Sequence, residues 1–443
     1  MGARCIVPYV FSCSMRESLY ILYRKCRAFC NSLCFYLCRM FPVQEKLISV
    51  CTFEGKGGFG CNPKYIVQEL HRRDPSLKFV WFVNDMAKDF PPYIRKVPNT
   101  LWSRAYWLSR SKVWLDNYRK PYGTRKRKGQ YYLNTNHYTL GIKCVGLWRG
   151  SGFSEMAYLV SRNDSDMIDG VVIDSVFCEQ MLPKGLVYGG PFLKTGAPRC
   201  DVLYGDRSAY KEAVRRKHCL PPDARIVMFA PTFREGAKDG VRSVFSEVWT
   251  IDFRRMLDAL EARFGGEWYI CTRVHPQLAP AFRGYSNPAV QSRMFDESHA
   301  DDMYEILAGM DAYITDYSSA CFEAAFAGIP VFLYADDVEA YTHDRGNLFW
   351  NMAGGDRHSA GINRELLPQL GVSLPFPLAR DNDELEADIR GFDGTAYARR
   401  LDEFCSKIGL VFDGQASGRL ADIVAGWISD HKKEWKSILE VAD

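Results

Sequence analysis

The feature that most constrains the fold is a regular alternation of short, β-rich runs with helical stretches, which begins near residue 44. Strands that alternate with helices are typical of parallel sheets covered by helices, since parallel strands need crossover connections. The predicted strands form two series along the chain. The first contains 46–53, 78–84, 112–118, 130–136 and 170–175, and the second contains 225–231, 267–274, 312–316 and 330–336.

A segment rich in Gly and Pro, residues 186–206, separates the two series and predicts a passage between two domains near residue 200. A chain of 443 residues is long enough for two or three domains. Two Rossmann-like α/β halves that face each other across a cleft would bind ligands at the carboxyl ends of their strands. We expect an N-terminal segment (1–43), a first Rossmann-like domain (44–200), a second (201–380) and C-terminal helices that pack back on the domains (381–443).

The N-terminal segment carries the basic excess of the chain. Residues 1–50 hold seven basic and two acidic side chains, a net charge of +5, whereas the whole chain carries +4. Ser14 and Glu17 form a capping-box pattern, and no Gly or Pro follows before Pro42, which predicts a helix of roughly 25 residues. Its charges leave no uncharged run of the ~18 residues that a spanning helix needs. Basic and aromatic residues together favour a helix lying on an anionic bilayer surface; the alternative is an ordinary core-packing helix.

The 15 cysteines include no CxxC pair, and no Cys/His set has zinc spacing. Without a convincing signal peptide, they favour a reducing, cytosolic setting over a disulfide scaffold. Cys26, Cys30, Cys34 and Cys38 recur every four residues and would share one helix face. They are interpreted either as small packing residues or as a site of lipidation or metal binding.

The small net charge argues against a polybasic nucleic-acid binder. One basic cluster after residue 50 lies in a predicted loop that contains Pro121 and Gly123. It would either touch lipid headgroups or an anionic polymer, or be merely solvated. Its members are Arg119, Lys120, Arg125, Lys126, Arg127 and Lys128.

The most informative stretch for chemistry is 312–334. A strand ends at Asp316, and Ser318 and Ser319 begin a helix that closes at Gly328, before Pro330. Free amides at a helix N-terminus, with two hydroxyls beside them, bind phosphate oxygens well. Simple helix capping by the same residues is the equal alternative.

Two further strands of the second series end in candidate phosphate-binding residues. His275 follows the strand 267–274, and Arg273 lies on the same side of that strand. An imidazole and a guanidinium at a carboxyl end suit a phosphorylated substrate, although a lone His before Pro is more often structural. The strand 225–231 leads into Thr232 and Arg234, which would form a diphosphate clamp.

In the first series, His137 follows the strand 130–136 and is flanked by Thr135, Asn136 and Thr139. Such a histidine could deprotonate an acceptor hydroxyl. Four glycines (Gly55, Gly57, Gly58 and Gly60) follow the first strand, but they match neither GxGxxG nor GK[ST]. They are interpreted either as a loop that faces the cleft and lets a ligand approach its backbone closely, or as a flexible turn.

Seven pieces in collinear order together resemble the CDP-glycerol glycerophosphotransferase family, which includes teichoic-acid-type polyol-phosphate polymerases and primases. The resemblance covers roughly residues 46–350. It rests on the Gly-rich loop with NPKY (62–65), VWLDNYRKP with RKGQYYLNTNH, TGAPRCD (195–201), FAPTFR, RVHP, ITDYSSACFE and YTHDRG (341–346).

The resemblance implies a GT-B arrangement, in which the C-terminal domain binds the cytidine nucleotide, and peripheral attachment to the cytoplasmic face of a bacterial membrane. It implies no obligatory metal and no cofactor, because the CDP-polyol is a substrate. The two important histidines would be His137 and His275. The residues that would bind substrate are Thr232, Arg234, Arg273, Asp316, Ser318, Ser319 and Glu323, with Gly57 and Gly58 in the first domain.

The expected reaction is attack by a hydroxyl of a lipid-linked or polymeric acceptor on the β-phosphorus of a CDP-polyol, glycerol being the first choice, with release of CMP. His137 would act as general base, and His275, Arg273 and Arg234 would stabilise charge. The expected partners are the CDP-polyol, the acceptor, a membrane surface and a possible second copy of the chain, with no nucleic acid.

One departure from the family pattern affects the acceptor side. Tyr138 follows the histidine where the family commonly has Gly, which puts the identity of the acceptor and of the polyol in doubt. Two alternatives stay open: a GT-B glycosyltransferase that uses a nucleotide sugar, and a non-catalytic membrane-bound scaffold of polymer or capsule assembly.

Overall fold

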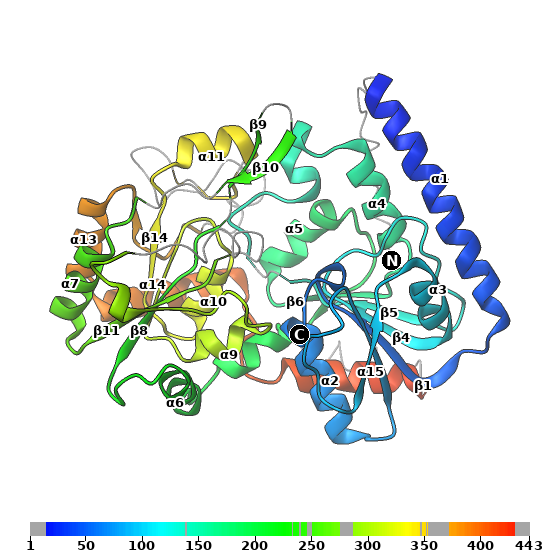
Figure 1. The fold of residues 1–443 in the computed structure, drawn as a ribbon, viewed down its shortest axis with the longest axis horizontal. Coiled ribbons are helices and arrows are strands. Elements are labelled where there is room, and N and C mark those ends of the chain that lie inside the picture. Colours follow the sequence, from blue (N-terminus) through cyan, green and yellow to red (C-terminus); the bar gives the residue numbers. More distant parts are fainter. Residues whose placement is uncertain are drawn as a thin grey trace. The chain divides into compact units, whose positions relative to one another are not determined.

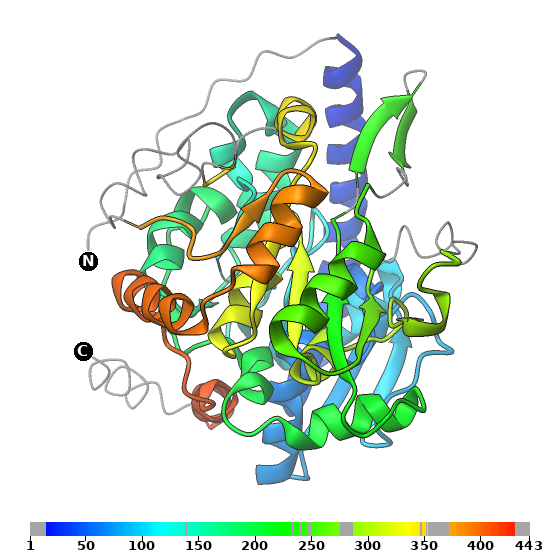
Figure 2. The same cartoon turned by 90° about the vertical axis from the view of Figure 1, so that its left-hand side faces the viewer.

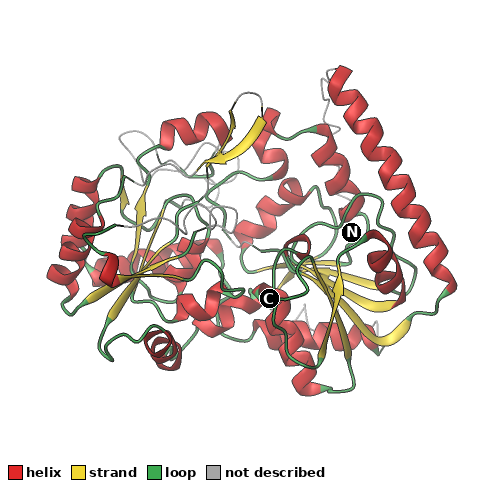
Figure 3. Cartoon of the chain, in the orientation of Figure 1, coloured by secondary structure: helices red, strands yellow, loops and turns green. Residues whose placement is uncertain are grey.

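The computed structural model describes residues 15–137, 140–232, 234–238, 241–245, 250–274, 287–345, 348–350, 352 and 372–429. The chain forms two compact units (Figure 1). The first unit consists of Met1–His137, Val145–Asp201 and Val411–Asp443, and the second consists of Tyr138–Cys144 and Val202–Leu410. Each unit has its own parallel sheet (Figure 3).

The first unit is built on a seven-stranded sheet in the order β3-β2-β1-β4-β5-β6-β7, in which all neighbouring strands are parallel. Strands β1 to β3 extend the sheet in one direction and β4 to β7 extend it in the other, so the carboxyl ends of the neighbouring strands β1 and β4 form the topological switch point. The strands are β1 (Gln44–Cys51), β2 (Lys78–Val83), β3 (Ile94–Pro98), β4 (Ser111–Asp116), β5 (Tyr131–Asn134), β6 (Gly170–Ile173) and β7 (Phe192–Lys194).

Helices cover this sheet and supply much of its core. The last helix of the described chain, α15, packs against α2 and contributes Leu420, Val424 and Trp427 to the same buried cluster as strands β1, β2 and β4 (Figure 1). The helices of this unit are α1 (Met15–Leu37), α2 (Cys61–Arg73), α3 (Leu101–Arg110), α4 (Glu155–Ser165), α5 (Val176–Leu186) and α15 (Ala416–Ile428).

The second unit is built on a six-stranded parallel sheet in the order β12-β11-β8-β13-β14-β15. Its switch point lies between β8 and β13. The antiparallel hairpin β9 (Arg234–Lys238) and β10 (Val241–Phe245) stands apart from this sheet. The sheet strands are β8 (Arg225–Phe229), β11 (Trp268–Thr272), β12 (Met294–Asp296), β13 (Ala312–Thr315), β14 (Val331–Tyr334) and β15 (Leu378–Ala379).

Helices also flank the second sheet, and α13 packs against α7 (Figure 2). Helix α10 begins directly after Ser319 and ends before Gly328, whose φ of +71° suits a residue without a Cβ. The helices are α6 (Ser208–Lys217), α7 (Phe253–Phe264), α9 (Met303–Ala308), α10 (Ala320–Phe326), α11 (Val338–Arg345), α13 (Asn382–Arg390) and α14 (Gly394–Ile408).

The predicted fold class, two Rossmann-like parallel-sheet halves preceded by a helix, is confirmed, and each of the nine predicted strands is present. The sequence did not indicate the short strands β7, β12 and β15, the edge strand β3 or the hairpin β9–β10. Strand β3 carries Arg95, Lys96 and Pro98, which hide an edge strand from a hydrophobicity pattern.

The predicted N-terminal helix is present as α1, a helix of 23 residues whose capping-box pair lies outside the described side chains. One face of α1 is buried on the first unit through Ile21, Ala28, Cys34 and Phe35. The other face exposes large apolar side chains. These are Leu19, Tyr20, Leu22, Tyr23, Phe29, Leu33, Tyr36 and Leu37.

Candidate functional site

His137 lies at the carboxyl edge of the first sheet, three residues beyond the end of β5. Its Nδ1 lies 2.8 Å from the main-chain oxygen of Asn117, which directly follows the neighbouring strand β4. Because a carbonyl oxygen can only accept a hydrogen bond, Nδ1 carries the proton. The lone pair of the neutral ring is therefore on Nε2, which makes this nitrogen the proton acceptor of His137.

Two aromatic rings flank the imidazole. The ring of Phe53 meets it edge-on with centroids 5.4 Å apart, and the ring of Tyr118 lies at 5.5 Å. Phe53 and Glu54 have φ values of +48° and +57°, a left-handed conformation that costs energy in residues with a side chain. The Oδ1 atom of Asn117 accepts the main-chain N–H of Phe53 at 2.8 Å, so the turn after β1 is tied to β4 beside the histidine.

The Gly-rich loop after β1 folds back on the end of that strand. Thr52 Oγ1 donates to the carbonyl oxygen of Gly58 at 3.0 Å, and a Cβ on Gly57 would lie 2.7 Å from the same Oγ1. The absence of a side chain at Gly57 is therefore required by packing. The assignment of Gly57 and Gly58 to substrate binding stays a prediction.

Asn62 and Asn117 belong to motifs that carry the family resemblance, but no role was predicted for either residue. Both are 1% exposed and lie within hydrogen-bond reach of the histidine loop. The Nδ2 atom of Asn117 is buried and has no hydrogen-bond partner among the described residues, which leaves a donor unsatisfied at the switch point. An Asn directly after a strand of a parallel sheet is the sequence signal that could have indicated Asn117, whereas Asn62 lies in the first turn of α2 and carries no such signal.

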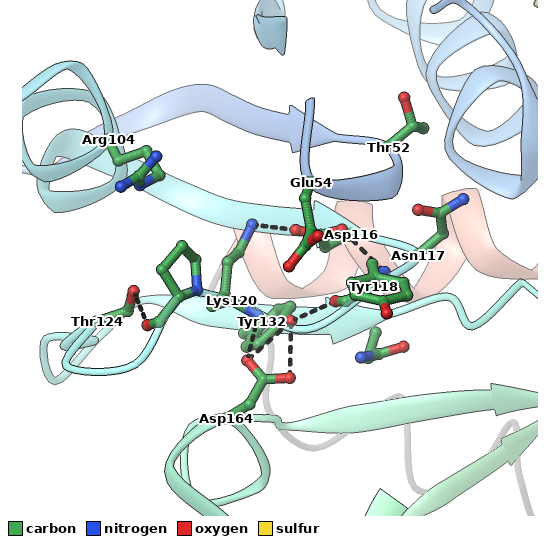
Figure 4. A network of polar contacts seen from close by, with 12 residues as sticks. Thr52, Glu54, Arg104, Asp116, Asn117, Tyr118, Lys120, Thr124, Tyr132 and Asp164 are labelled. Atoms are coloured by element: carbon green, nitrogen blue, oxygen red, sulfur yellow. Dashed lines mark hydrogen bonds and ion pairs between the residues drawn. The ribbon is translucent and has the colours of Figure 1, made fainter. Parts of the chain in front are cut away.

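A buried polar network adjoins this edge (Figure 4). Lys120 Nζ forms an ion pair with Asp116 Oδ2 at 2.6 Å, and both side chains are 3% exposed. The Tyr132 hydroxyl and the main-chain N–H of Lys120 donate to Asp164 Oδ1 at 3.2 and 3.0 Å. Burial raises the pKa of Asp164 to about 7 and also raises the pKa of Asp116, because a low-polarity surrounding disfavours the charged carboxylate.

The basic cluster 119–128 is mainly engaged with the protein itself. Lys120 is buried in the network above, Lys126 pairs with Asp169, and Arg125 Nη1 donates to Asn163 Oδ1 at 2.6 Å. Arg127 Nη1 donates to the main-chain oxygens of residues 41 and 109. These four side chains therefore stabilise the loop, and a contact of the cluster with lipid headgroups or an anionic polymer stays a prediction.

In the second unit, predicted site residues meet at the switch point between β8 and β13. The carboxylate of Asp316 accepts the main-chain N–H of Thr232 at 2.9 Å and that of Tyr317 at 2.5 Å. Asp316 thus fixes the turns that follow both strands. Ser318 and Ser319 come next and are half-buried, with Ser318 Oγ accepting the main-chain N–H of Ala320 at 3.4 Å.

Two other predicted residues make contacts inside the unit. Arg273 donates to the main-chain oxygens of Glu297 and Ala300, and burial lowers the pKa of its guanidinium. Glu323 is 1% exposed and accepts the hydroxyl of Tyr304 at 2.5 Å. These contacts give both residues a structural role, and their assignment to substrate binding stays a prediction.

Some predictions fall outside the described residues. These are the placements of His275, Tyr138 and Thr139 and of the side chain of Arg234.

Across the described part of the chain, no three or more His, Cys, Asp or Glu side chains are grouped to hold a metal ion. No helix in that part is long and apolar enough to cross a membrane. Of the four cysteines on α1 and just beyond it, Cys26 and Cys30 are exposed, whereas Cys34 and Cys38 are buried.

The sequence is similar to several enzymes of teichoic acid synthesis. It is 25% identical over 394 residues to the teichoic acid poly(glycerol phosphate) polymerase of Staphylococcus epidermidis. This match covers 86% of this chain and 51% of that protein. It is 24% identical over 397 residues to the teichoic acid glycerol-phosphate transferase of Staphylococcus aureus. This match covers 86% of this chain and 93% of that protein. The match covers 41% of the related polymerase of Bacillus subtilis, so the chain spans about half the length of these two polymerases.

The fold is similar to that of a solved polymerase. The structure of the wall teichoic acid polymerase TagF superposes with a TM-score of 0.72 at 21% identity and covers 96% of this chain and 100% of that one. The sequence profile of a single family matches residues 33–357, a range that contains both switch points and all predicted site residues. The chain belongs to the CDP-glycerol:poly(glycerophosphate) glycerophosphotransferase family.

Proposed function

We propose that the protein transfers a polyol phosphate, glycerol phosphate in the first instance, from a CDP-activated donor to an acceptor hydroxyl and releases CMP. The acceptor is a hydroxyl of a lipid-linked or polymeric chain of the teichoic acid type. The observation that carries the proposal is the arrangement around His137 in a member of this family. Its Nδ1 is bound to the carbonyl of Asn117, which leaves Nε2 as a base for a hydroxyl proton.

The second unit supplies the donor side of the proposal. Thr232, Ser318 and Ser319 lie at the carboxyl edge of β8 and β13, where parallel α/β sheets bind nucleotides. Hydroxyls and main-chain amides suit the oxygens of a diphosphate. We assign the charge-stabilising roles to His275 and Arg234 from the sequence, with no metal required. Arg273 would contribute only if its main-chain contacts rearranged.

The test is incubation of the full chain with CDP-glycerol or CDP-ribitol and candidate acceptors, with CMP and product masses as the readout. We expect CMP release that depends on the acceptor, and a product heavier by one or more polyol phosphate units. Release of a nucleoside diphosphate from a nucleotide sugar would instead support the glycosyltransferase alternative. Nucleotide binding without turnover would support the scaffold alternative.

We further propose that the protein works as a peripheral protein at the cytoplasmic face of the membrane, with the exposed face of α1 against the lipid. The same helix carries Arg24 and Arg27, whose guanidinium groups lie over the rings of the exposed Tyr20 and Tyr23. Apolar and cationic groups on one helix face bind anionic bilayers by burial and by charge attraction.

A full-length variant with Leu22→Gln, Phe29→Gln and Leu33→Gln tests this surface. These side chains are 49–70% exposed, so the fold of the first unit should persist. We expect binding to phosphatidylglycerol vesicles to fall about tenfold or more, since each tenfold change needs only about 1.4 kcal/mol of lost burial.

The matched control replaces Met86 and Tyr204 by Gln, because these are similarly exposed and lie outside α1. The control should bind vesicles like the wild type. Binding of the triple variant at the wild-type level would exclude the α1 face as the lipid contact, and equal binding to phosphatidylcholine would exclude the role of anionic charge.

A further inference from the structure

We propose that Asn62 is a positioning residue for His137. It acts through the loop between β5 and the histidine and does not touch the reacting atoms. This proposal rests on the proposed function, because it assigns a role within the same reaction. It also predicts a property of the histidine ring that can be measured without turnover.

The side chain of Asn62 joins three segments that are distant in sequence. Its Nδ2 donates to the main-chain oxygens of Thr135 and Asn136 at 2.7 and 3.0 Å, and its Oδ1 accepts the main-chain N–H of Arg199 at 3.0 Å. The side chain is 1% exposed, so these bonds form in a dry interior, where they hold geometry most firmly.

The side chain of Asn62 does not cap its own helix, α2. Asn62 lies in the first turn of α2, where an Asn could satisfy free amides of the helix. The N-cap of α2 is instead Gly60, which forms no side-chain cap, and every hydrogen bond of the Asn62 side chain goes to another segment. The residue therefore serves the tertiary arrangement of the loop.

The loop has a conformation that few residues other than Gly and Asn adopt. Asn136 has a φ of +53°, a left-handed value next to the histidine. On the other side, Thr135 donates its N–H and its hydroxyl to the carbonyl oxygen of Asp116 at 2.8 and 3.2 Å. Asn62 and Asp116 thus hold the loop from two directions and place the imidazole so that Nδ1 meets the carbonyl of Asn117.

The informative variant is Asn62→Asp, which keeps the shape of the side chain. One carboxylate oxygen still accepts the N–H of Arg199, but the other faces two carbonyl oxygens that have lost their donors. Repulsion then tilts the loop and releases the imidazole. We expect kcat to fall about 100-fold, as for small misplacements of a catalytic group, while KM for the CDP-polyol changes less than about twofold.

Gln130 provides a matched control in the same unit. Its Nε2 donates to the main-chain oxygens of Leu108 and Ser111, both at 2.6 Å, and its Oε1 accepts the N–H of Arg127 at 2.8 Å. The side chain is 3% exposed and lies at the opposite end of β5 from His137. Gln130→Glu therefore repeats the same change in a buried amide, and we expect it to lower thermal stability like Asn62→Asp while leaving kcat within about twofold of the wild type.

The direct readout is the tautomer of His137 in protein labelled with ¹⁵N at histidine, with its signals identified by their loss in His137→Ala. We expect the Nδ1–H tautomer in the wild type and in Gln130→Glu, and a mixture of tautomers in Asn62→Asp.

Unchanged tautomer and kcat in Asn62→Asp, or equal loss of kcat in both variants, would overturn the positioning role. If Asn62→Asp does not fold, Asn62→Ala removes the donors without adding a charge. A wild type that releases no CMP would refute the proposed function, while the tautomer measurement would still test Asn62.

Discussion

His137→Ala is expected to lower kcat for acceptor-dependent CMP release by about 10²–10⁴-fold, the range that a general base contributes. The carbonyl of Asn117 fixes the proton on Nδ1, so the wild-type ring presents Nε2 as the base. Alanine removes that base and also the ring packed between Phe53 and Tyr118. The measurement is steady-state CMP release at saturating CDP-polyol.

Two further variants separate chemistry from packing. His137→Gln keeps a polar side chain of similar reach but has no basic nitrogen, so it should be nearly as slow as the alanine variant. His71→Phe is the control, because His71 stacks on Tyr93 at 3.8 Å in the same unit and a phenyl ring preserves that stacking. Turnover of His137→Gln close to the wild-type rate would contradict the role of base.

Lys120→Met is expected to destabilise the first unit by about 3–5 kcal/mol, the usual cost of breaking a buried ion pair. The Lys120 ammonium and the Asp116 carboxylate are both almost wholly buried, 2.6 Å apart. Removing the ammonium leaves Asp116 without its counter-charge, and burial already raises the pKa of this carboxyl. Denaturant unfolding followed by tryptophan fluorescence would measure the loss.

The exposed pair Lys46–Asp74 is the matched control, with side chains 56% and 44% exposed and a separation of 3.3 Å. Lys46→Met should cost under about 1 kcal/mol, because solvent screens exposed pairs. The double variant Asp116→Asn with Lys120→Met should recover much of the loss, since it leaves no unpaired charge inside. Equal destabilisation by Lys46→Met and Lys120→Met would contradict this explanation.

The fold could be predicted because hydrophobic, β-branched runs stand out wherever a strand is buried on both faces. Strands β1, β2, β4, β8 and β13 have long runs of buried residues, and all were predicted. Strands at or near the sheet edges are shorter or carry charge, as in β3 and β15, so their sequences resemble loops. The hairpin β9–β10 has no comparable hydrophobic pattern in its first strand, REGAK.

The candidate site could be predicted only in part. His137 and Asp316 follow strands, and that position alone indicates a carboxyl-edge site. The partners of these residues are mostly main-chain atoms, such as the carbonyl of Asn117 and the N–H of Thr232. Since every residue type supplies a main-chain carbonyl and every type except proline a main-chain N–H, no pattern of side chains could have indicated these contacts.

The return of the chain to the first unit at Val411 has a consequence for biosynthesis. The N–H of Val411 donates to the carbonyl of Asp174, Asp201 caps the start of α15, and α15 completes the core beside α2. A ribosome makes residues 202–410 before it reaches this helix. Synthesis of these residues takes roughly 10–40 s at ordinary elongation rates. The unit that emerges first is therefore finished last, and a nascent chain that stops before residue 411 leaves its oldest sheet without part of its hydrophobic cover.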